Sequence, residues 1–579
     1  MTTTIESPPA ASSSGREGKT TSREQLDTAL AILQNNKQSW AQLSLVDLVA
    51  LIDSLMDEFK LVAKDWVDAA LAAKGISPRA ATAGEEWLGG PYSLLRNLRL
   101  FRQTLDTLRR KGDPELPGPV RTRASGIVSA RVFPTDLYDQ LFFMGTTAEI
   151  WMEPEVSQDR LKETMCAYYR KPPESGRICL VLGAGNVASI GPMDVIYKMF
   201  VERKVALLKM HPVNEYLGPF FERAFQPLIS RGFLQIVYGG ADVGSYLCNH
   251  TSIGEIHITG SDKTHDVIVF GGEVEKRKAD RDPFLNKPIT SELGNVSPVV
   301  IVPGDWSKSD IAFQAANIAS SLANNGGFNC NASRVLVMQK GWKHREALLD
   351  GIRAVFKTLP QRDAYYPGAF DRHKAFLAEH PDAELIGERT DKKLPWTLIP
   401  GLDPAHKDDI CFNTEAFCSV FGETCLEAAD PAEFIVKATE FANETLWGTL
   451  NMTMLIHPST LADKGVEAAF EKALEDLRYG TISVNHWAAV CYAMGSTTWG
   501  AHPGHDIYDI QSGLDVVHNG YMFDKPMKSV VRGPFRPWPK PAWFATHKTS
   551  HYLGKKLTNF EASPSPLKLP GIFLEAFLG

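Results

Sequence analysis

An α/β fold with a parallel, doubly wound sheet is predicted for the middle of this chain of 579 residues. Between Arg177 and about residue 300, short apolar segments alternate with single helical segments. Strands separated by one helix each require βαβ crossovers, which place parallel strands in one sheet. Beyond about residue 300, strand and helix patterns mix again, so a second α/β domain is predicted.

The N-terminal region divides into two parts. Residues 1–25 are rich in Ser, Thr, Pro and charge and contain no apolar run typical of a signal peptide, which favours a disordered tail. From residue 26 to about 112, Leu and Val recur every three or four positions, as in amphipathic helices. We therefore group 26–294 as N-terminal helices followed by the first α/β domain.

The remaining boundaries follow from changes in pattern. A charged insert at about 271–287 interrupts the strand order, either as a surface loop or as a partner-binding element. Residues 295–490 are predicted to form the second α/β domain, and 491–579 a closing segment with a C-terminal extension. Beyond Val530 the chain is rich in Pro and aromatic residues and shows little regular pattern.

Composition excludes several classes of function. The net charge of −7 does not suit a nucleic-acid binder, which usually has a basic excess. Eight cysteines without CxxC pairs indicate a reduced, cytoplasmic protein rather than one held by disulfides. No stretch of about 20 uncharged apolar residues is present, so no transmembrane segment is predicted.

Cys330 is the first candidate for chemistry. It follows two glycines at the end of a predicted helix, where the backbone can turn sharply and a substrate can approach. Only a thiolate is a good nucleophile, and a loop of backbone N–H groups could lower the thiol pKa from its usual value of about 8.5. A buried structural cysteine is the competing interpretation.

Three other polar residues lie at the edges of predicted strands. Glu292 precedes a buried strand and is either a general base or a solvated carboxylate. Asn186 follows a strand and a glycine pair, at the kind of corner where open α/β sheets place ligands. Lys209 ends the next strand and could reach ribose hydroxyls or phosphate. A complete GxGxxG fingerprint is absent, since Ala188 stands where its last glycine would be.

Taken together, these motifs resemble the aldehyde dehydrogenase superfamily over about residues 177–519. TSELGNVSP is similar to the family's ELGGKSP, NNGGFNCNASRV to its GQxCxAxxR loop, and NTEAFCSVFG to its ExFGP motif. GNVASIGPMDVIYKMF, VALLKMHP and the segment ending in HITGSD match further motifs. Because all of them occur in the family's order, the resemblance implies an aldehyde dehydrogenase-like fold with an oligomerisation extension.

The resemblance implies a role for each matching residue. Cys330 would be the nucleophile, Asn186 would form an oxyanion hole with the Cys330 backbone N–H, and Glu292 would be the general base. Lys209 and Glu415 would hold the cofactor riboses. The residues implied near the rest of the cofactor are Phe417 at the nicotinamide, and Gly240, Gly244 and Ser261 at the phosphate and adenine end.

The implied activity is NAD- or NADP-dependent oxidation of an aldehyde to a carboxylic acid, by a homodimer or homotetramer. Two alternatives remain: a CoA-acylating enzyme (an acyl-CoA reductase), and a cofactor-binding scaffold without catalysis. Retention of Glu292 favours transfer of the acyl group to water, and the presence of both Cys330 and Glu292 disfavours the scaffold.

Several departures limit the comparison. Pro212 replaces a family carboxylate that often contacts the adenine ribose, which leaves the choice between NAD and NADP open. Gly240 keeps only one of two family glycines. The C-terminal tail has no counterpart in the common family members, and its aromatic residues could pack on their own domain, wrap a neighbouring subunit, cover a substrate tunnel or touch a membrane. These aromatic residues are Trp538, Trp543 and Phe544.

Other candidate residues carry weaker signals. His486, Trp487 and Trp499 could line an aldehyde pocket or belong to the core. No metal site is predicted, because His502 and His505 lack an evident third ligand, and three cysteines at seven-residue spacing form no CxxC pair. These cysteines are Cys411, Cys418 and Cys425.

Overall fold

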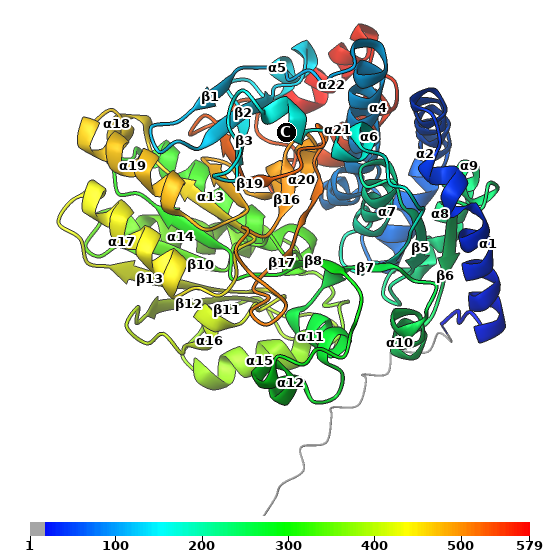
Figure 1. Ribbon diagram of the computed structural model, residues 1–579. Helices are drawn as coiled ribbons and strands as arrows, with labels where there is room; N and C mark the ends of the chain where they lie inside the picture. Colours follow the sequence, from blue (N-terminus) through cyan, green and yellow to red (C-terminus); the bar gives the residue numbers. More distant parts are fainter. Residues whose placement is uncertain (1–17) are drawn as a thin grey trace, which may run out of the picture.

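A six-stranded sheet forms the first α/β unit of the computed structural model, which describes residues 18–579 (Figure 1). Its strands lie in the order β17 (Gly513–Leu514), β8 (Ile289–Leu293), β7 (Glu255–Gly260), β4 (Ile178–Leu182), β5 (Val205–Lys209), β6 (Leu234–Val237). All neighbours are parallel except β17, which pairs antiparallel with β8. The strand order turns back at β4, so the predicted α/β class with a doubly wound sheet is confirmed.

The helical N-terminus begins earlier than predicted. Ser22 caps α1 through a capping box with Gln25, so the helix starts at Arg23, inside the predicted disordered tail of residues 1–25. That prediction is wrong for 23–25, and residues 1–17 lie outside the described part of the chain. The helices of this region are α1 (Arg23–Ala41), α2 (Leu45–Ala73), α3 (Gly84–Trp87) and α4 (Ser93–Lys111).

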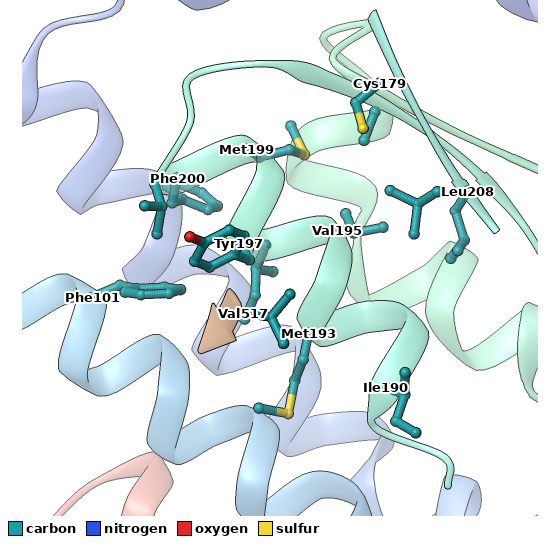
Figure 2. Packing of buried hydrophobic residues seen from close by; sticks show 14 of the residues in the cluster. Phe101, Cys179, Ile190, Met193, Val195, Tyr197, Met199, Phe200, Leu208 and Val517 are labelled. Atoms are coloured by element: carbon teal, nitrogen blue, oxygen red, sulfur yellow. The ribbon is translucent and has the colours of Figure 1, made fainter. Parts of the chain in front are cut away.

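Helix α7 (Ile190–Phe200) is the central element of the first unit. All eleven of its residues are buried, which explains its nearly continuous apolar sequence. Figure 2 shows it between Cys179 and Leu208 of the sheet on one side and Phe101 of α4 on the other. Because α7 starts four residues after Asn186, this packing fixes the loop that carries that asparagine.

Helices connect and cover the strands of the first sheet. They are α8 (Gly218–Ala224), α9 (Gln226–Ile229), α10 (Ala241–Asn249), α11 (Asp262–Phe270) and α12 (Val274–Asp280). Helix α12 occupies the charged insert at 271–287, lies at the surface and packs on α11, where Lys278 pairs with Asp266. The insert is thus a short surface helix with flanking loops.

An eleven-stranded sheet forms the second unit. Its order is β1 (Val120–Thr122), β2 (Val128–Phe133), β3 (Thr147–Met152), β19 (Pro526–Arg532), β15 (Thr481–Val484), β14 (Asn451–Leu455), β9 (Pro298–Ile301), β10 (Val335–Gln339), β13 (Val420–Leu426), β12 (Trp396–Leu402), β11 (Glu384–Ile386). A separate pair joins β16 (Thr498–Gly500) to β18 (Val516–His518).

Both faces of this second sheet are covered by helices. Alternate residues of β9 face opposite sides of the sheet. Val299 and Ile301 belong to the hydrophobic cluster of α13 (Lys308–Ala323) and α14 (Arg345–Thr358), whereas Val300 belongs to that of α17 (Pro431–Glu444) and α19 (Lys464–Asp476). Burial on both faces explains why β9 is apolar throughout. Further helices here are α15 (Ala369–Glu379) and α20 (Ala489–Met494).

Two segments pair across the predicted domain boundaries. Strands β1–β3, within the region 26–294 that we grouped with the first unit, join the second sheet because β3 pairs antiparallel with β19. Conversely, β17 of the closing segment 491–579 joins the first sheet through β8. Such long-range antiparallel pairs leave no local periodicity, which is why the linear division misplaced them.

The C-terminal extension is more regular than predicted. After a Pro-rich stretch it forms α21 (Ser550–Ala562) and α22 (Leu569–Phe577), drawn in red in Figure 1. Helix α21 packs on α3 and α4 of the same chain, so the extension covers its own N-terminal helices. Within residues 18–579, no helix combines the length and hydrophobicity that a membrane span requires.

A buried ion-pair network holds α21 in place. Arg96 pairs with Asp139 at 2.9 Å and with Glu561 at 3.0 Å, and Arg99 reaches the other Glu561 oxygen at 2.7 Å. The side chains of Arg96 and Glu561 are only 1% and 3% exposed. Removal of the Glu561 charge would therefore leave two buried guanidinium groups less compensated.

We expect Glu561→Gln to lower the free energy of unfolding by about 3–5 kcal/mol, the usual cost of breaking a buried ion pair. The urea midpoint, followed by tryptophan fluorescence, measures this change. Glu575→Gln is the matched control, because Glu575 pairs with the half-exposed Lys556 and should cost less than about 1 kcal/mol. Equal midpoints for the two variants would contradict the proposed anchoring.

Candidate active site

The loop before Cys330 makes a sharp turn that glycine allows. Helix α13 is followed by three residues with positive φ: Asn325 at 53°, Gly326 at 68° and Gly327 at 83°. A Cβ on Gly327 would lie 2.4 Å from the carbonyl oxygen of Cys418. No larger residue fits there, so this glycine brings the cysteine loop tightly against the strand that starts at Val420.

Hydrogen bonds then fix the backbone of Cys330. Its carbonyl oxygen accepts from Asn451 Nδ2 at 3.0 Å and from Ser297 Oγ at 3.3 Å. The buried guanidinium of Arg334 donates to the carbonyl oxygens of Gly327 and Cys418 at 2.5 and 2.6 Å. The loop is therefore rigid, as a nucleophile requires if its sulfur is to meet a bound carbonyl in a defined geometry.

Glu292 lies beside the sulfur of Cys330. The glutamate is the fourth residue of β8, is 4% exposed, and lies close enough to the Cys330 side chain for the two groups to shift each other's pKa. Its Oε1 also accepts from Trp499 Nε1 at 2.8 Å. Burial raises the pKa of Glu292 to about 8, with Asp194 and Glu415 adding to the rise and the Trp499 hydrogen bond opposing it. A carboxyl group with such a pKa can give and take protons near neutral pH.

The Cys330 thiol differs from the expectation. Instead of being lowered by the loop N–H groups, its pKa is raised well above the usual value, first by burial and then by the nearby Glu292 and Glu415 charges. The backbone N–H contributes only the smallest effect. The thiol therefore needs a base to become a thiolate, and Glu292 is the carboxylate with the largest effect on it.

Asn186, which follows strand β4 of the first sheet, contacts the loop that carries Cys330. Its Nδ2 donates to the carbonyl oxygen of Phe328 at 2.9 Å, two residues before the cysteine. An amide nitrogen has two protons, so one remains for a further acceptor. Asn186 and Cys330 line one cavity of about 230 Å³. Cys330 therefore shares a cavity wall with Asn186 and lies next to Glu292, an arrangement compatible with the predicted roles of the three residues.

A buried network that sequence reasoning missed orients Asn186. The backbone carbonyl oxygen of Asn186 accepts hydrogen bonds from Lys74 Nζ at 3.3 Å, Asn325 Nδ2 at 2.9 Å and the Tyr365 hydroxyl at 3.0 Å. Lys74 also donates to Glu86 at 2.7 Å, and both side chains are about 5% exposed. Lys74 carries no motif; its only signal is its position as the C-cap of α2, directly before Gly75.

The three aromatic and histidine candidates fall into two groups. His486 and Trp487 line the cavity, and Trp487 Nε1 donates to the Asn331 carbonyl oxygen at 2.6 Å. Trp499 does not line the cavity, and its Nε1 donates a hydrogen bond to Glu292. Burial lowers the pKa of His486 to about 4, so its ring is neutral at physiological pH.

The residues implied for the adenine end lie at the carboxyl edge of the first sheet. Lys209 ends β5, is 9% exposed and forms no ion pair with any residue in 18–579. Its Cε lies 4.0 Å from where a Cβ on Gly244 would be, so the lysine runs along α10, whose N-cap is Gly240. Ser261 caps α11 by accepting from the Thr264 N–H at 3.2 Å. The Lys209 ammonium and the N-terminal ends of α10 and α11 thus lie at the same edge of the sheet.

Glu415 lies between the two units. A Cβ on Gly294 would be 2.0 Å from its Oε2, so the glycine after Glu292 and Leu293 makes room for this carboxylate. Its Oε1 is buried and finds no partner among residues 18–579. Burial raises its pKa to about 7, while Arg334 and Arg372 lower it. An orphaned buried acceptor normally indicates a missing donor, and a ribose hydroxyl would supply one.

Phe417 and His211 form the aromatic wall of this region. Phe417 has a strained φ of 39°, and its ring centroid lies 4.9 Å from that of Tyr366. The other face of the cluster is His211, stacked 6.0 Å from Tyr366, with its pKa lowered to about 4 by burial. The neutral His211 directly precedes Pro212, the residue that replaces the family carboxylate.

The histidine pair considered for a metal is not part of a ligand cluster. Within 18–579, one group of three potential ligands comes close enough to share an ion, namely His380, Asp409 and Cys411. Asp409 already uses its Oδ1 to cap the N–H of Cys411 at 2.8 Å and to contact His380 at 3.1 Å. Local hydrogen bonding accounts for this cluster.

Comparison with known proteins finds similarity to aldehyde dehydrogenases. Residues 205–369 match the model of the aldehyde dehydrogenase family. The chain is 32% identical over 109 residues to 4-trimethylaminobutyraldehyde dehydrogenase of Bos taurus, and 33% identical over 124 residues to that of Rattus norvegicus. These matches cover 19% and 21% of this chain and 19% and 22% of the relatives, so the chain aligns with about a fifth of each relative's length.

Structural comparison covers much more of the chain. It matches an NADP-dependent glyceraldehyde-3-phosphate dehydrogenase from Bacillus halodurans, complexed with NADP, with a TM-score of 0.57 and 16% identity over 88% of this chain and 92% of the other. It matches an NAD-dependent aldehyde dehydrogenase from Sinorhizobium meliloti with a TM-score of 0.58 and 16% identity over 90% and 89%. The fold that the motifs predicted is thereby confirmed.

Proposed function

We propose that this chain, which has the aldehyde dehydrogenase fold and matches that family's model over residues 205–369, oxidises an aldehyde to a carboxylic acid with NAD or NADP. The observation that carries the proposal is that Cys330, which lines one cavity with Asn186, lies next to the buried carboxyl group of Glu292. A thiol, a base and an amide donor are the groups that this oxidation requires.

The first half of the reaction uses Cys330 and Asn186. Glu292 takes the thiol proton, and the sulfur adds to the aldehyde carbonyl to give a hemithioacetal oxyanion on Cys330. The free Asn186 N–H and the Cys330 backbone N–H would donate to that oxyanion. Since Asn186 is held by Lys74 and Tyr365, little reorganisation is needed as the charge develops.

The second half uses Glu292. When bound, the nicotinamide cofactor supplies the acceptor for the hydride that leaves as the oxyanion collapses to a thioester. After Glu292 has released the thiol proton to solvent, it removes a proton from the water that attacks the thioester carbon. The tetrahedral adduct then collapses to the carboxylic acid with the Cys330 sulfur as leaving group, and Glu292 returns the proton to that sulfur. Burial excludes other water from the site, so one base controls hydrolysis.

Two polar groups that have no partner within residues 18–579 would be available to bind the cofactor. The orphaned Oε1 of Glu415 would accept from one ribose, and the unpaired Lys209 would donate to the other. Gly240 and Gly244 on α10 and Ser261 at α11 would border the phosphates, and Phe417 would contact the nicotinamide. With Pro212 in place of a carboxylate, a 2′-phosphate meets no repulsion from that position, so both NAD and NADP are proposed as cofactors.

An absorbance assay at the reduced-nicotinamide band tests the function. We expect NADH or NADPH to form with at least one class among short, long and aromatic aldehydes, and mass spectrometry to identify the free acid as product. The same product with and without CoA supports hydrolysis, whereas a CoA thioester would assign the acylating reaction instead. Folded protein that reduces neither cofactor with any aldehyde would overturn the proposal.

Asn186→Ala tests the oxyanion role. We expect kcat to fall by about 10²–10³, the usual effect of losing one such donor, with KM changed much less, because the donor acts mainly in the transition state. Asn331→Ala is the control: this residue lines the same cavity, and the family resemblance implies no oxyanion role for it. A loss confined to KM in Asn186→Ala would argue against transition-state stabilisation.

The assembly and the cellular location are also part of the proposal. The superfamily resemblance supports a homodimer or homotetramer, and eight free cysteines support the reducing cytoplasm. Light scattering coupled to size-exclusion chromatography tests the first point, with a monomer mass of 63.9 kDa contradicting it. Fractionation of the source cells tests the second.

A further inference from the structure

The cavity at Cys330 extends far beyond the reacting atoms. One continuous cavity reaches from Cys330 and Asn186 past α20 to the C-terminal extension, where α21 and α22 form its outer wall. Its rim carries exposed apolar side chains, with Met144 45% and Trp538 69% exposed. The apolar lining residues that matter here are Leu141, Val187, Val490, Trp543, Leu557 and Ile572.

The acidic side chains of the cavity wall lie at its inner end, and each is paired with a cation there. The two carboxylates of the wall, Glu86 and Glu85, pair with Lys74 at 2.7 Å and Arg362 at 2.9 Å. The charged group near the outer end is Lys540, whose Nζ donates to the Thr546 carbonyl oxygen at 3.2 Å. Among the described residues, the wall therefore offers no free anion to a cationic substrate.

The extension is held firmly enough to serve as a wall. Trp543 packs on Trp487 at 5.1 Å between ring centroids, and Phe544 packs on Phe313 at 5.2 Å. The Ala545 N–H donates to Ser320 Oγ at 2.9 Å. With Glu561 anchoring α21, these contacts tie the segment both to the helix that leads to the nucleophile and to the N-terminal helices.

We propose that this cavity binds an uncharged aliphatic aldehyde of medium to long chain, with its carbonyl at Cys330 and its hydrocarbon chain against α20, α21 and α22. This assignment rests on the proposed function. Apolar walls bind methylene groups by removing them from water, and the carbonyl end meets the donors at Cys330 and Asn186. A cationic aldehyde such as 4-trimethylaminobutyraldehyde, which appears in the names of the relatives, would meet no unpaired carboxylate among the described wall residues.

A homologous series tests the substrate class. For saturated aldehydes from propanal to dodecanal, we expect kcat/KM to rise by about fourfold for each added CH2 until the chain fills the cavity. We expect 4-trimethylammoniobutanal to be turned over less efficiently than hexanal. Turnover of propanal with no gain along the series, or a preference for the cation, would overturn this inference alone, while silence with every aldehyde would overturn the proposed function.

A matched pair of variants tests the role of α22. Ala576 is half-buried and lines the cavity, whereas Leu574 on the same helix is 55% exposed and does not. We expect Ala576→Trp to lower kcat/KM for decanal at least tenfold while changing that for propanal less than twofold. Leu574→Trp should change neither. Equal effects of Ala576→Trp on both aldehydes, or an effect of Leu574→Trp on decanal alone, would place the hydrocarbon chain elsewhere.

Discussion

Replacing Cys330 with alanine is expected to reduce NAD(P)H formation by ~10⁴-fold or more, the scale of loss seen when a covalent nucleophile is removed. The reason is that a hemithioacetal needs a thiol, and among the described residues that line the cavity Cys330 is the one cysteine. Cofactor binding, measured by fluorescence titration, should persist, because the implied cofactor residues lie on other elements.

A second cysteine provides a close control for this experiment. Cys425 hydrogen-bonds a glutamate, with its Sγ 3.1 Å from Glu423 Oε1, and burial raises its pKa to about 12. It lies on β13, away from the cavity. Cys425→Ala should keep full activity. If Cys330→Ala retained activity while Cys425→Ala lost it, the nucleophile would have been assigned to the wrong cysteine.

The sequence was sufficient to predict the residues that approach along regular strands. Asn186 and Lys209 follow or end consecutive parallel strands, and such ends meet at one sheet edge. Glu292 and Cys330 were recognisable because each stands in a motif with glycines that allow close backbone approach. Gly294 and Gly327 do meet Glu415 and the backbone of Cys418 at distances that exclude a side chain.

What the sequence did not predict depends on contacts between distant segments. The raised thiol pKa of Cys330 comes from burial and from Glu292, and neither can be read from the residues next to the cysteine. Likewise, Lys74 reaches Asn186 across 112 positions of the chain. The pairing of β3 with β19 joins segments more than 370 residues apart, and no local pattern encodes it.

The most informative experiment concerns the second half of the reaction. Glu292→Gln should acylate Cys330 slowly, because the thiol has lost its base, and should hydrolyse the thioester more slowly still, because glutamine cannot take a proton from water. We expect steady-state kcat to fall by about 10²–10⁴, the usual contribution of a general base. Glutamine keeps an oxygen for Trp499, so the fold is retained. A burst of reduced cofactor equal to the enzyme concentration, with an acyl adduct on Cys330 by mass spectrometry, would identify the stalled step.

The pH dependence separates this role from a structural one. Burial raises the Glu292 pKa to about 8, so its basic form increases as pH rises through 8, and the wild-type hydrolysis rate should rise with pH and level off above that value. Trp499→Phe removes the hydrogen bond that lowers this pKa, and the rising limb should then move to higher pH. The limb should vanish in Glu292→Gln. If the glutamine variant kept the wild-type profile, the proton would be taken by another group, and Glu292 would serve only to hold the thiol.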